Sequence, residues 1–125
     1  ETIGRRILVA WNGSTETARA LSAARPLLAT CEAVQELAVE GGLVSGPDVE
    51  IITAHLRASG FKAQAKTRDS SGTTVGQVIV SEAQDFGADL IVKGAFTHSR
   101  LRQLVFGGAT SEIFNHATCP VIMCH

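Results

Sequence analysis

The sequence has little net charge, no long apolar run and few cysteines, and each of these shortages excludes a class of protein. Its 11 Lys and Arg residues nearly balance its 12 Asp and Glu residues, which gives a formal net charge of −1. That balance excludes a field strong enough to attract nucleic acid or an anionic membrane as a general partner, so any anion site must be local. No apolar run approaches the ~20 residues of a membrane-spanning helix, and the first residues lack the pattern of a signal peptide. We therefore expect a cytoplasmic protein.

Cysteine is also scarce, because the chain has three cysteines, Cys31, Cys119 and Cys124. An odd number without C-x-x-C or zinc-ligand spacing disfavours both a disulfide framework and a metal site, and it favours a reducing compartment. A redox enzyme would need Cys119 or Cys124 to be an activated thiolate, and the basic neighbours in sequence are limited to His116 and His125. We expect Cys119 and Cys124 to be small buried hydrophobic side chains instead.

The composition is otherwise that of an ordinary globular protein, 45% hydrophobic and 18% charged. We predict one domain over residues 1–125, which is long enough to bury its own core. Apolar runs at 7–11 and 90–92 indicate strands that are buried on both faces. Further strands are predicted at 34–39, 61–68 and 120–123.

Residues 61–68 differ from the other strands because apolar and polar side chains alternate strictly. Such a strand belongs at a sheet edge, and we expect its basic side, which carries Lys66 and Arg68, to be solvated. Helices are predicted between the strands, with polar caps at Ser14 and Thr74 and a helix start at Pro47 and Asp48. The clearest helical stripe runs from Val75 to Phe86.

Strands and helices alternate throughout, so we predict an α/β fold with a five-stranded parallel sheet, strand order 3-2-1-4-5, and helices on both faces. Ligands of such sheets bind at the carboxyl ends of the strands, where the strand order reverses. Asn12 and Gly94 should lie at that point, between the first and fourth strands. A loop-capping role for Asn12 is an equal alternative.

Glycines follow the fourth strand at Gly94 and again at Gly107 and Gly108, before a helix predicted over 109–116. A glycine-lined helix start can hold a phosphate, because its backbone N–H groups lack internal partners and carry partial positive charge. The alternative is that these glycines only permit tight turns. His98, Ser99 and Arg100 add donors between the glycines, although they can also be solvated loop residues.

Four segments carry a resemblance to the universal stress protein family. Residues 7–14, ILVAWNGS, resemble the family's ILVAVDGS start, and 59–61 resemble its helix-to-strand junction. Residues 88–94, ADLIVKG, resemble its A-D-L-I-V-x-G strand, and 119–122, CPVI, its CPVLVV tail. The resemblance covers essentially the whole chain and implies a Rossmann-like, adenine nucleotide alpha hydrolase-like fold.

The ATP-binding members of that family carry G-x2-G-x9-G-[S/T] after the fourth strand. Gly94 and Gly107 match the first and third glycines, while Thr97 stands at the second. Gly108 replaces the Ser or Thr, with Thr110 two places later as a substitute hydroxyl. Asn12 likewise replaces the family's aspartate after the first strand and keeps an acceptor.

The resemblance implies an adenine nucleotide, ATP or AMP, with Mg²⁺ as an uncertain companion. Adenine would lie near Ala10 and Asn12 and ribose near Gly94. The residues expected around the phosphates are Thr97, His98, Ser99, Arg100, Gly107, Gly108, Ala109 and Thr110.

Two functions follow from the resemblance. The first is a nucleotide-binding regulatory domain in the stress response. It would not be an efficient enzyme, because the carboxylates we place near the loop are few, Asp89 and Glu112. The second is a nucleotide-independent interaction module that pairs through the last strand, at Val121, Ile122 and Met123. The pairing partner would be a second copy or, since the chain starts at Glu1 without methionine, a preceding domain of the same polypeptide.

Overall fold

The computed structural model describes residues 3–41, 43–70, 72–94, 113 and 116–124. Within these residues strands and helices alternate as predicted, and the strand ends fall within a residue or two of the predicted ones. The elements in chain order are β1 (Arg6–Ala10), α1 (Thr15–Leu28), β2 (Ala33–Glu40), α2 (Val49–Ala58), β3 (Ala63–Asp69), α3 (Val75–Phe86), β4 (Leu90–Gly94) and β5 (Val121–Cys124). None of the helices in this described part is long and apolar enough to cross a bilayer.

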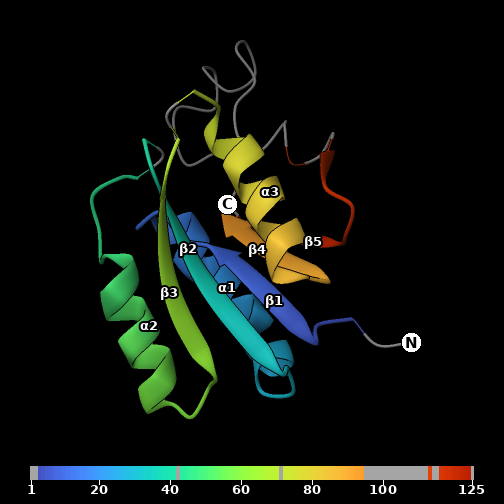
Figure 1. Cartoon of the computed structure of the whole chain (residues 1–125). Helices are drawn as coiled ribbons and strands as arrows, with labels where there is room; N and C mark the ends of the chain where they lie inside the picture. Colours follow the sequence, from blue (N-terminus) through green and yellow to red (C-terminus); the bar gives the residue numbers. More distant parts are fainter. Residues whose placement is uncertain (1–2, 42, 71, 95–112, 114–115, 125) are drawn as a thin grey trace.

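All five strands form one parallel sheet in the order β3-β2-β1-β4-β5 (Figure 1), which confirms the predicted topology. From β1 the chain proceeds through β2 to β3 on one side. It then crosses back, so that β4 pairs with the other side of β1. The strand order therefore reverses between β1 and β4, and this is where open α/β sheets bind their ligands.

Helices cover both faces of the sheet, which explains the continuous apolar runs in β1 and β4. Ile7 and Val9 of β1 belong to the core cluster that includes residues of α1 and α2. Leu8 and Ala10 belong to the second cluster, which includes residues of α3. Figure 1 shows α3 in front of the sheet and α1 behind it. A strand buried on both faces has no reason to alternate apolar and polar residues.

Each helix begins after a polar cap. Ser14 and Thr74 were predicted as caps, whereas Asp48 was predicted only as part of a helix start. The side chains of Ser14, Asp48 and Thr74 accept from the backbone N–H three residues later, which gives one unpaired helix-start donor a partner. α3 ends at Gly87, whose φ of 73° is in the left-handed region that glycine adopts without strain. Capping residues therefore set both the start and the end of α3.

The basic side of β3 is not simply solvated, and this corrects the prediction from its alternating pattern. Lys66 Nζ lies 3.0 Å from Glu82 Oε2, and Arg68 is bonded to Glu82 Oε1. The Glu82 side chain is 1% exposed on α3, whereas Lys66 and Arg68 are 45% and 40% exposed. A carboxylate with so little access to water needs a cation beside it. The two bases therefore tie β3 to α3 across the sheet face.

Much of the segment after β4 lies outside the described residues, including most of the helix predicted over 109–116. Ile113 is described there and is fully buried in the α3-side cluster, as predicted for an inward residue. Its carbonyl accepts from the backbone N–H of Ala117 at 2.9 Å. Ile113 therefore belongs to the core between α3 and the sheet, in the cluster that also includes residues of β4 and against which residues of β5 pack.

Candidate functional site

Three predicted site residues come together at the carboxyl edge of β1 and β4. Ala10 ends β1 and is in register with Lys93, the neighbour of Gly94 at the end of β4. Asn12 follows Ala10 in the short segment that leads to α1. The other predicted residues lie outside the described part of the chain: Thr97, His98, Ser99, Arg100, Gly107, Gly108, Ala109 and Thr110.

Asn12 has a structural role at the start of α1. Its side-chain oxygen Oδ1 accepts from Ser14 N at 3.0 Å and from Thr17 Oγ1 at 2.7 Å. Ser14 Oγ in turn accepts from Thr17 N at 3.1 Å. The capping alternative for Asn12 is therefore confirmed, and its acceptor is already occupied when no ligand is bound.

The variant Asn12→Ala removes the acceptor of two hydrogen bonds at a helix start. We expect it to lower the free energy of unfolding by about 1–2 kcal/mol, the usual cost of losing such a cap. Asn12→Asp keeps an oxygen in place and puts a negative charge at the positive end of α1, so it should retain or slightly raise stability. Urea unfolding of both variants checks this. Equal losses in the two would show that the oxygen of Asn12 is not what matters.

Gly94 is a point of close backbone approach between β4 and α1. A Cβ at this position would lie 2.5 Å from Thr17 N and 2.8 Å from Thr17 Oγ1, closer than side chains are found in proteins. The backbone of Gly94 is not in the left-handed region, so a turn requirement does not explain the glycine. It lets the first turn of α1 pack on the end of β4, which brings the start of α1 to the switch point.

A contact between two loops encloses the same edge. Trp11 Nε1 donates to Pro47 O at 2.8 Å, and Val44 N donates to Asn12 O at 2.9 Å. Gly46 lies so close to Gly13 that a Cβ on it would be 1.9 Å from the Gly13 carbonyl oxygen. The loop between β2 and α2 therefore packs directly on the loop between β1 and α1. This contact was not predicted from the sequence, although the Gly-Pro pair at 46–47 was a signal of a constrained loop.

Lys93 is the charged residue that the sequence analysis did not assign to the site. It lies in β4, where its ammonium group donates to Gly94 O at 2.8 Å. Burial lowers the pKa of Lys93 to about 8, so the side chain still carries most of a positive charge at neutral pH. A charged residue inside an apolar run was the available signal. Its position, one residue before Gly94, brings a poorly solvated cation to the switch point.

The carboxylate Asp89 lies at the other end of β4, which corrects its placement near the predicted phosphate loop. Its two oxygens accept from the backbone N–H groups of Gly4, Arg5 and Arg6 at 3.1–3.2 Å. Asp89 therefore holds the start of β1 at the amino edge of the sheet. Glu112, the other predicted carboxylate, is outside the described residues. Among the described residues no three His, Cys, Asp or Glu side chains are grouped in a way that could hold a metal ion.

Cys31 and Cys119 show no sign of activation. Burial raises the pKa of the Cys119 thiol, and it also raises that of Cys31. Cys31 donates its S–H to the carbonyl of Leu28 at 3.2 Å. A reactive cysteine needs a lowered pKa, so the direction of these shifts argues against thiolate chemistry at both residues.

The fold agrees with comparisons to known proteins. A universal stress protein from Archaeoglobus fulgidus DSM 4304 superposes with a TM-score of 0.80 at 19% identity, over 98% of this chain and 44% of that chain. A universal stress protein in complex with cAMP has a TM-score of 0.72 at 14% identity, over 97% of both chains. One from Archaeoglobus fulgidus in complex with dAMP has a TM-score of 0.65 at 19% identity, over 96% of both chains. No curated protein matches the sequence.

The structural likeness at these identities establishes the fold. The sequence adds its own evidence, because the model of the universal stress protein family matches residues 4–125. The present chain spans less than half of the first Archaeoglobus protein. The activity of that whole protein is therefore not assigned to this chain. This chain belongs to the universal stress protein family.

Proposed function

We propose that this chain is a regulatory domain of the stress response that binds an adenine nucleotide at the carboxyl edge of β1 and β4. The observation that carries the proposal is the convergence of Lys93, Gly94 and the start of α1 at the point where the strand order reverses. A cation with little access to water and a helix start both favour a negatively charged ligand. Family relatives crystallised with cAMP and dAMP support an adenine nucleotide as that ligand.

Binding, rather than catalysis, is what the described residues support. Asp89 is engaged at the amino edge and is not available to a metal beside the nucleotide phosphates. Mg²⁺ would then be held mainly by phosphate oxygens and its own water molecules, as is usual for this ion. Phosphoryl transfer needs a positioned nucleophile and a positioned metal ion. We therefore propose nucleotide binding without efficient hydrolysis.

The test is a binding measurement on the purified chain with ATP, AMP and cAMP, with and without Mg²⁺. A ligand at a hundred times its Kd should add about 2.7 kcal/mol to the free energy of unfolding, which thermal unfolding detects. Isothermal titration then gives the affinity. An unchanged unfolding temperature at millimolar concentrations of all three nucleotides would refute the proposal.

Lys93→Met locates the site within that experiment. We expect roughly tenfold weaker ATP binding, equivalent to about 1.4 kcal/mol, because a desolvated positive charge near the phosphates is lost. The matched control is Lys62→Met, which removes an exposed lysine beside the start of β3, at the other end of the sheet. Gly107→Val, at a position outside the described residues, should block the phosphates if the predicted glycine motif holds them. Equal ATP affinity in the parent and Lys93→Met would move the site away from β4.

The alternative function is a nucleotide-independent pairing module. β5 is an edge strand that is hydrogen-bonded to β4 on one side, and its residues, Val121, Ile122 and Met123 among them, are all half-buried. A short apolar edge strand can pair with another strand. The partner would be a second copy or a preceding homologous domain. Sedimentation equilibrium with and without nucleotide tests this, since a monomer at all concentrations would exclude the homodimer.

A further inference from the structure

A basic and partly aromatic hollow lies at the amino edge of the sheet, at the end opposite the proposed nucleotide site. Its volume is about 540 Å³, and it is open to solvent. It lies where β1, β2 and β3 begin and where α2 and α3 end. The charged and aromatic residues of its lining are Arg6, Arg57, Phe61, Lys62 and Phe86. We call it the amino-edge hollow.

Two of its three cations are held in place by bonds to the backbone. Arg6 Nε donates to Phe86 O at 2.8 Å, and its guanidinium carbon lies 4.3 Å from the centre of the Phe86 ring. Arg57 Nε donates to Ala63 O at 2.6 Å. A guanidinium anchored through Nε has lost its rotational freedom before a ligand arrives. Binding an anion through its terminal nitrogens therefore costs less side-chain entropy.

The charges in the hollow are not neutralised by carboxylates, unlike those of Arg5, Lys66 and Arg68. Lys66 and Arg68 share Glu82, and Arg5 is paired with Glu32. Within the described residues, Arg6, Arg57 and Lys62 form no such ion pair, and the lining contains no carboxylate. Asp89 lies at the same edge, but its oxygens are engaged with backbone N–H groups. The hollow is thus a local positive region on a chain whose net charge is −1.

Apolar surface accompanies this charge. The rings of Phe61 and Phe86 are both half-buried at the hollow. Each ring has a guanidinium over it, that of Arg25 at 5.2 Å from the centre of Phe61 and that of Arg6 at 4.3 Å from the centre of Phe86, so an apolar ligand group would contact the part of each ring that these cations leave open. Inorganic phosphate would satisfy the cations and make no apolar contact with the open part of the rings. A nucleic acid would require a longer basic surface than three side chains. Carboxylates next to an apolar side chain match both features of the hollow.

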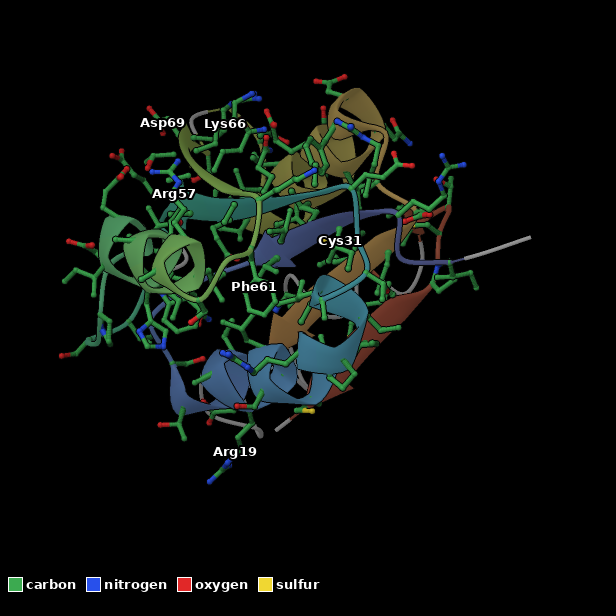
Figure 2. The ribbon with its side chains drawn as sticks, turned by 90° about the horizontal axis from the view of Figure 1, so that it is seen from below. Arg19, Cys31, Arg57, Phe61, Lys66 and Asp69 are labelled. Atoms are coloured by element: carbon green, nitrogen blue, oxygen red, sulfur yellow. The ribbon has the colours of Figure 1, made fainter. Side chains whose placement is uncertain are left out.

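We propose that the amino-edge hollow binds an acidic segment of a partner protein, in which Glu or Asp residues flank an aromatic or large aliphatic residue. The carboxylates would pair with Arg6, Arg57 and Lys62, and the apolar residue would pack on the phenyl rings. Because the hollow and the carboxyl edge are at opposite ends of the strands, this binding does not depend on the proposed nucleotide site. Arg57 and Phe61 are labelled in Figure 2, which views the molecule from below.

The experiment is an NMR titration of the isotope-labelled chain with the peptide acetyl-Glu-Glu-Phe-Glu-Glu-Leu-amide. We expect amide shifts concentrated at residues 33, 57, 61–64 and 86, and an affinity that falls as salt is added. The same peptide with Lys in place of Glu should cause none of these shifts. Shifts spread evenly over the surface, or centred on the carboxyl edge, would overturn the proposal.

Matched charge reversals test which residues carry the binding. Lys62→Glu should weaken peptide binding at least fivefold, because it replaces an attraction with a repulsion and breaks no ion pair that the described structure shows. Arg19→Glu makes the same change in charge on α1, and Figure 2 shows Arg19 far from Phe61 and Arg57. It should alter the affinity less than twofold. The spectra also report whether each variant is folded, and equal effects of the two reversals would count against the hollow.

Two other ligands test whether the hollow binds nucleic acid or phosphate instead of an acidic peptide. An oligonucleotide of thymidine and inorganic phosphate should each leave the amino-edge amides in place at concentrations where the peptide moves them. If the oligonucleotide shifted those amides and the peptide did not, the hollow would be a nucleic-acid site and the proposal would be wrong.

Discussion

Gly94→Ala is expected to destabilise the fold by about 3 kcal/mol or more. The added Cβ would lie 2.5 Å from Thr17 N and 2.8 Å from the carbonyl carbon of Glu16. These are mainly backbone atoms in the first turn of α1, and they cannot move aside as the end of a flexible side chain can. Either α1 shifts off the end of β4 or the strand bends, and overpacking of this kind costs about 1–3 kcal/mol and sometimes more. Denaturant unfolding measures the loss.

Gly60→Ala is the matched control for this substitution. A Cβ on Gly60 would meet no atom within 4 Å, but its φ of 92° is in the left-handed region. The control should therefore cost about 1 kcal/mol from backbone strain alone. If Gly94→Ala cost no more than Gly60→Ala, the close approach of α1 to β4 would not be a constraint. A folded but destabilised Gly94→Ala chain should also bind nucleotide more weakly, because the start of α1 would have moved.

Glu36→Gln is expected to make the chain more stable than the parent at pH 9 and to change little at pH 5. Glu36 is completely buried in β2, and neither of its carboxyl oxygens has a hydrogen-bond partner among the described residues. Burial alone raises the pKa of Glu36 to about 8. The residue therefore enters the folded state as a neutral acid at neutral pH.

Among the described residues, none near Glu36 would offset its charge. Its register neighbours are Val9 on β1 and Ala65 on β3. The buried residues of α1 and α2, which cover this face, include no titratable side chain. Thr53 on α2 is buried as well, and its hydroxyl also lacks a partner among the described residues. Ionised Glu36 would thus be an unpaired charge in the core, which is costly.

The direction of the pH effect follows from the raised pKa. Below the pKa of Glu36 in the unfolded chain, near 4.5, Glu36 is protonated in both the folded and the unfolded state. In this range its ionisation does not lower the free energy of unfolding. As the pH rises toward 8, the unfolded chain loses the proton while the folded chain keeps it, so stability falls. The full difference is on the order of 5 kcal/mol, since the pKa rises by about 3.5 units at about 1.4 kcal/mol per unit. Gln cannot ionise, so the variant should lack this decline.

The measurement is denaturant unfolding of parent and variant across this pH range. The difference between them should grow from pH 5 to pH 8 and then level off, since the folded carboxyl ionises there. Two parallel curves would mean that Glu36 has the pKa of an ordinary glutamate and reaches solvent or a partner in the folded chain.

The fold was predictable because its signals are local. Apolar runs at 7–11 and 90–92, helical stripes between the strands, and helix starts at Ser14, Asp48 and Thr74 each depend on neighbours within a few residues. Their alternation leaves few topologies for a parallel sheet. The carboxyl ends of adjacent parallel strands lie at one edge, so the meeting of Asn12 and Gly94 followed from the same argument.

The roles of the side chains were harder to predict. Alternation in β3 indicated that Lys66 and Arg68 leave the core, but not that Glu82 on α3 would meet them. Gly94 was interpreted as a turn or as space for a phosphate, whereas the first turn of α1 occupies the space that a side chain would need. Asp89 was expected near the phosphate loop and lies at the amino edge instead.

Periodicity and capping in the linear chain thus determined which segments are strands and helices, how they are layered, and which residues meet at the carboxyl edge of β1 and β4. Tertiary structure alone decided the charge state of Glu36 and Lys93, the ion pairs of Glu82 and the basic hollow at the amino edge. The physical reason is distance along the chain. Hydrophobic periodicity and caps act between near neighbours, whereas desolvation, charge pairing and steric contact depend on groups that come together only when the chain has folded.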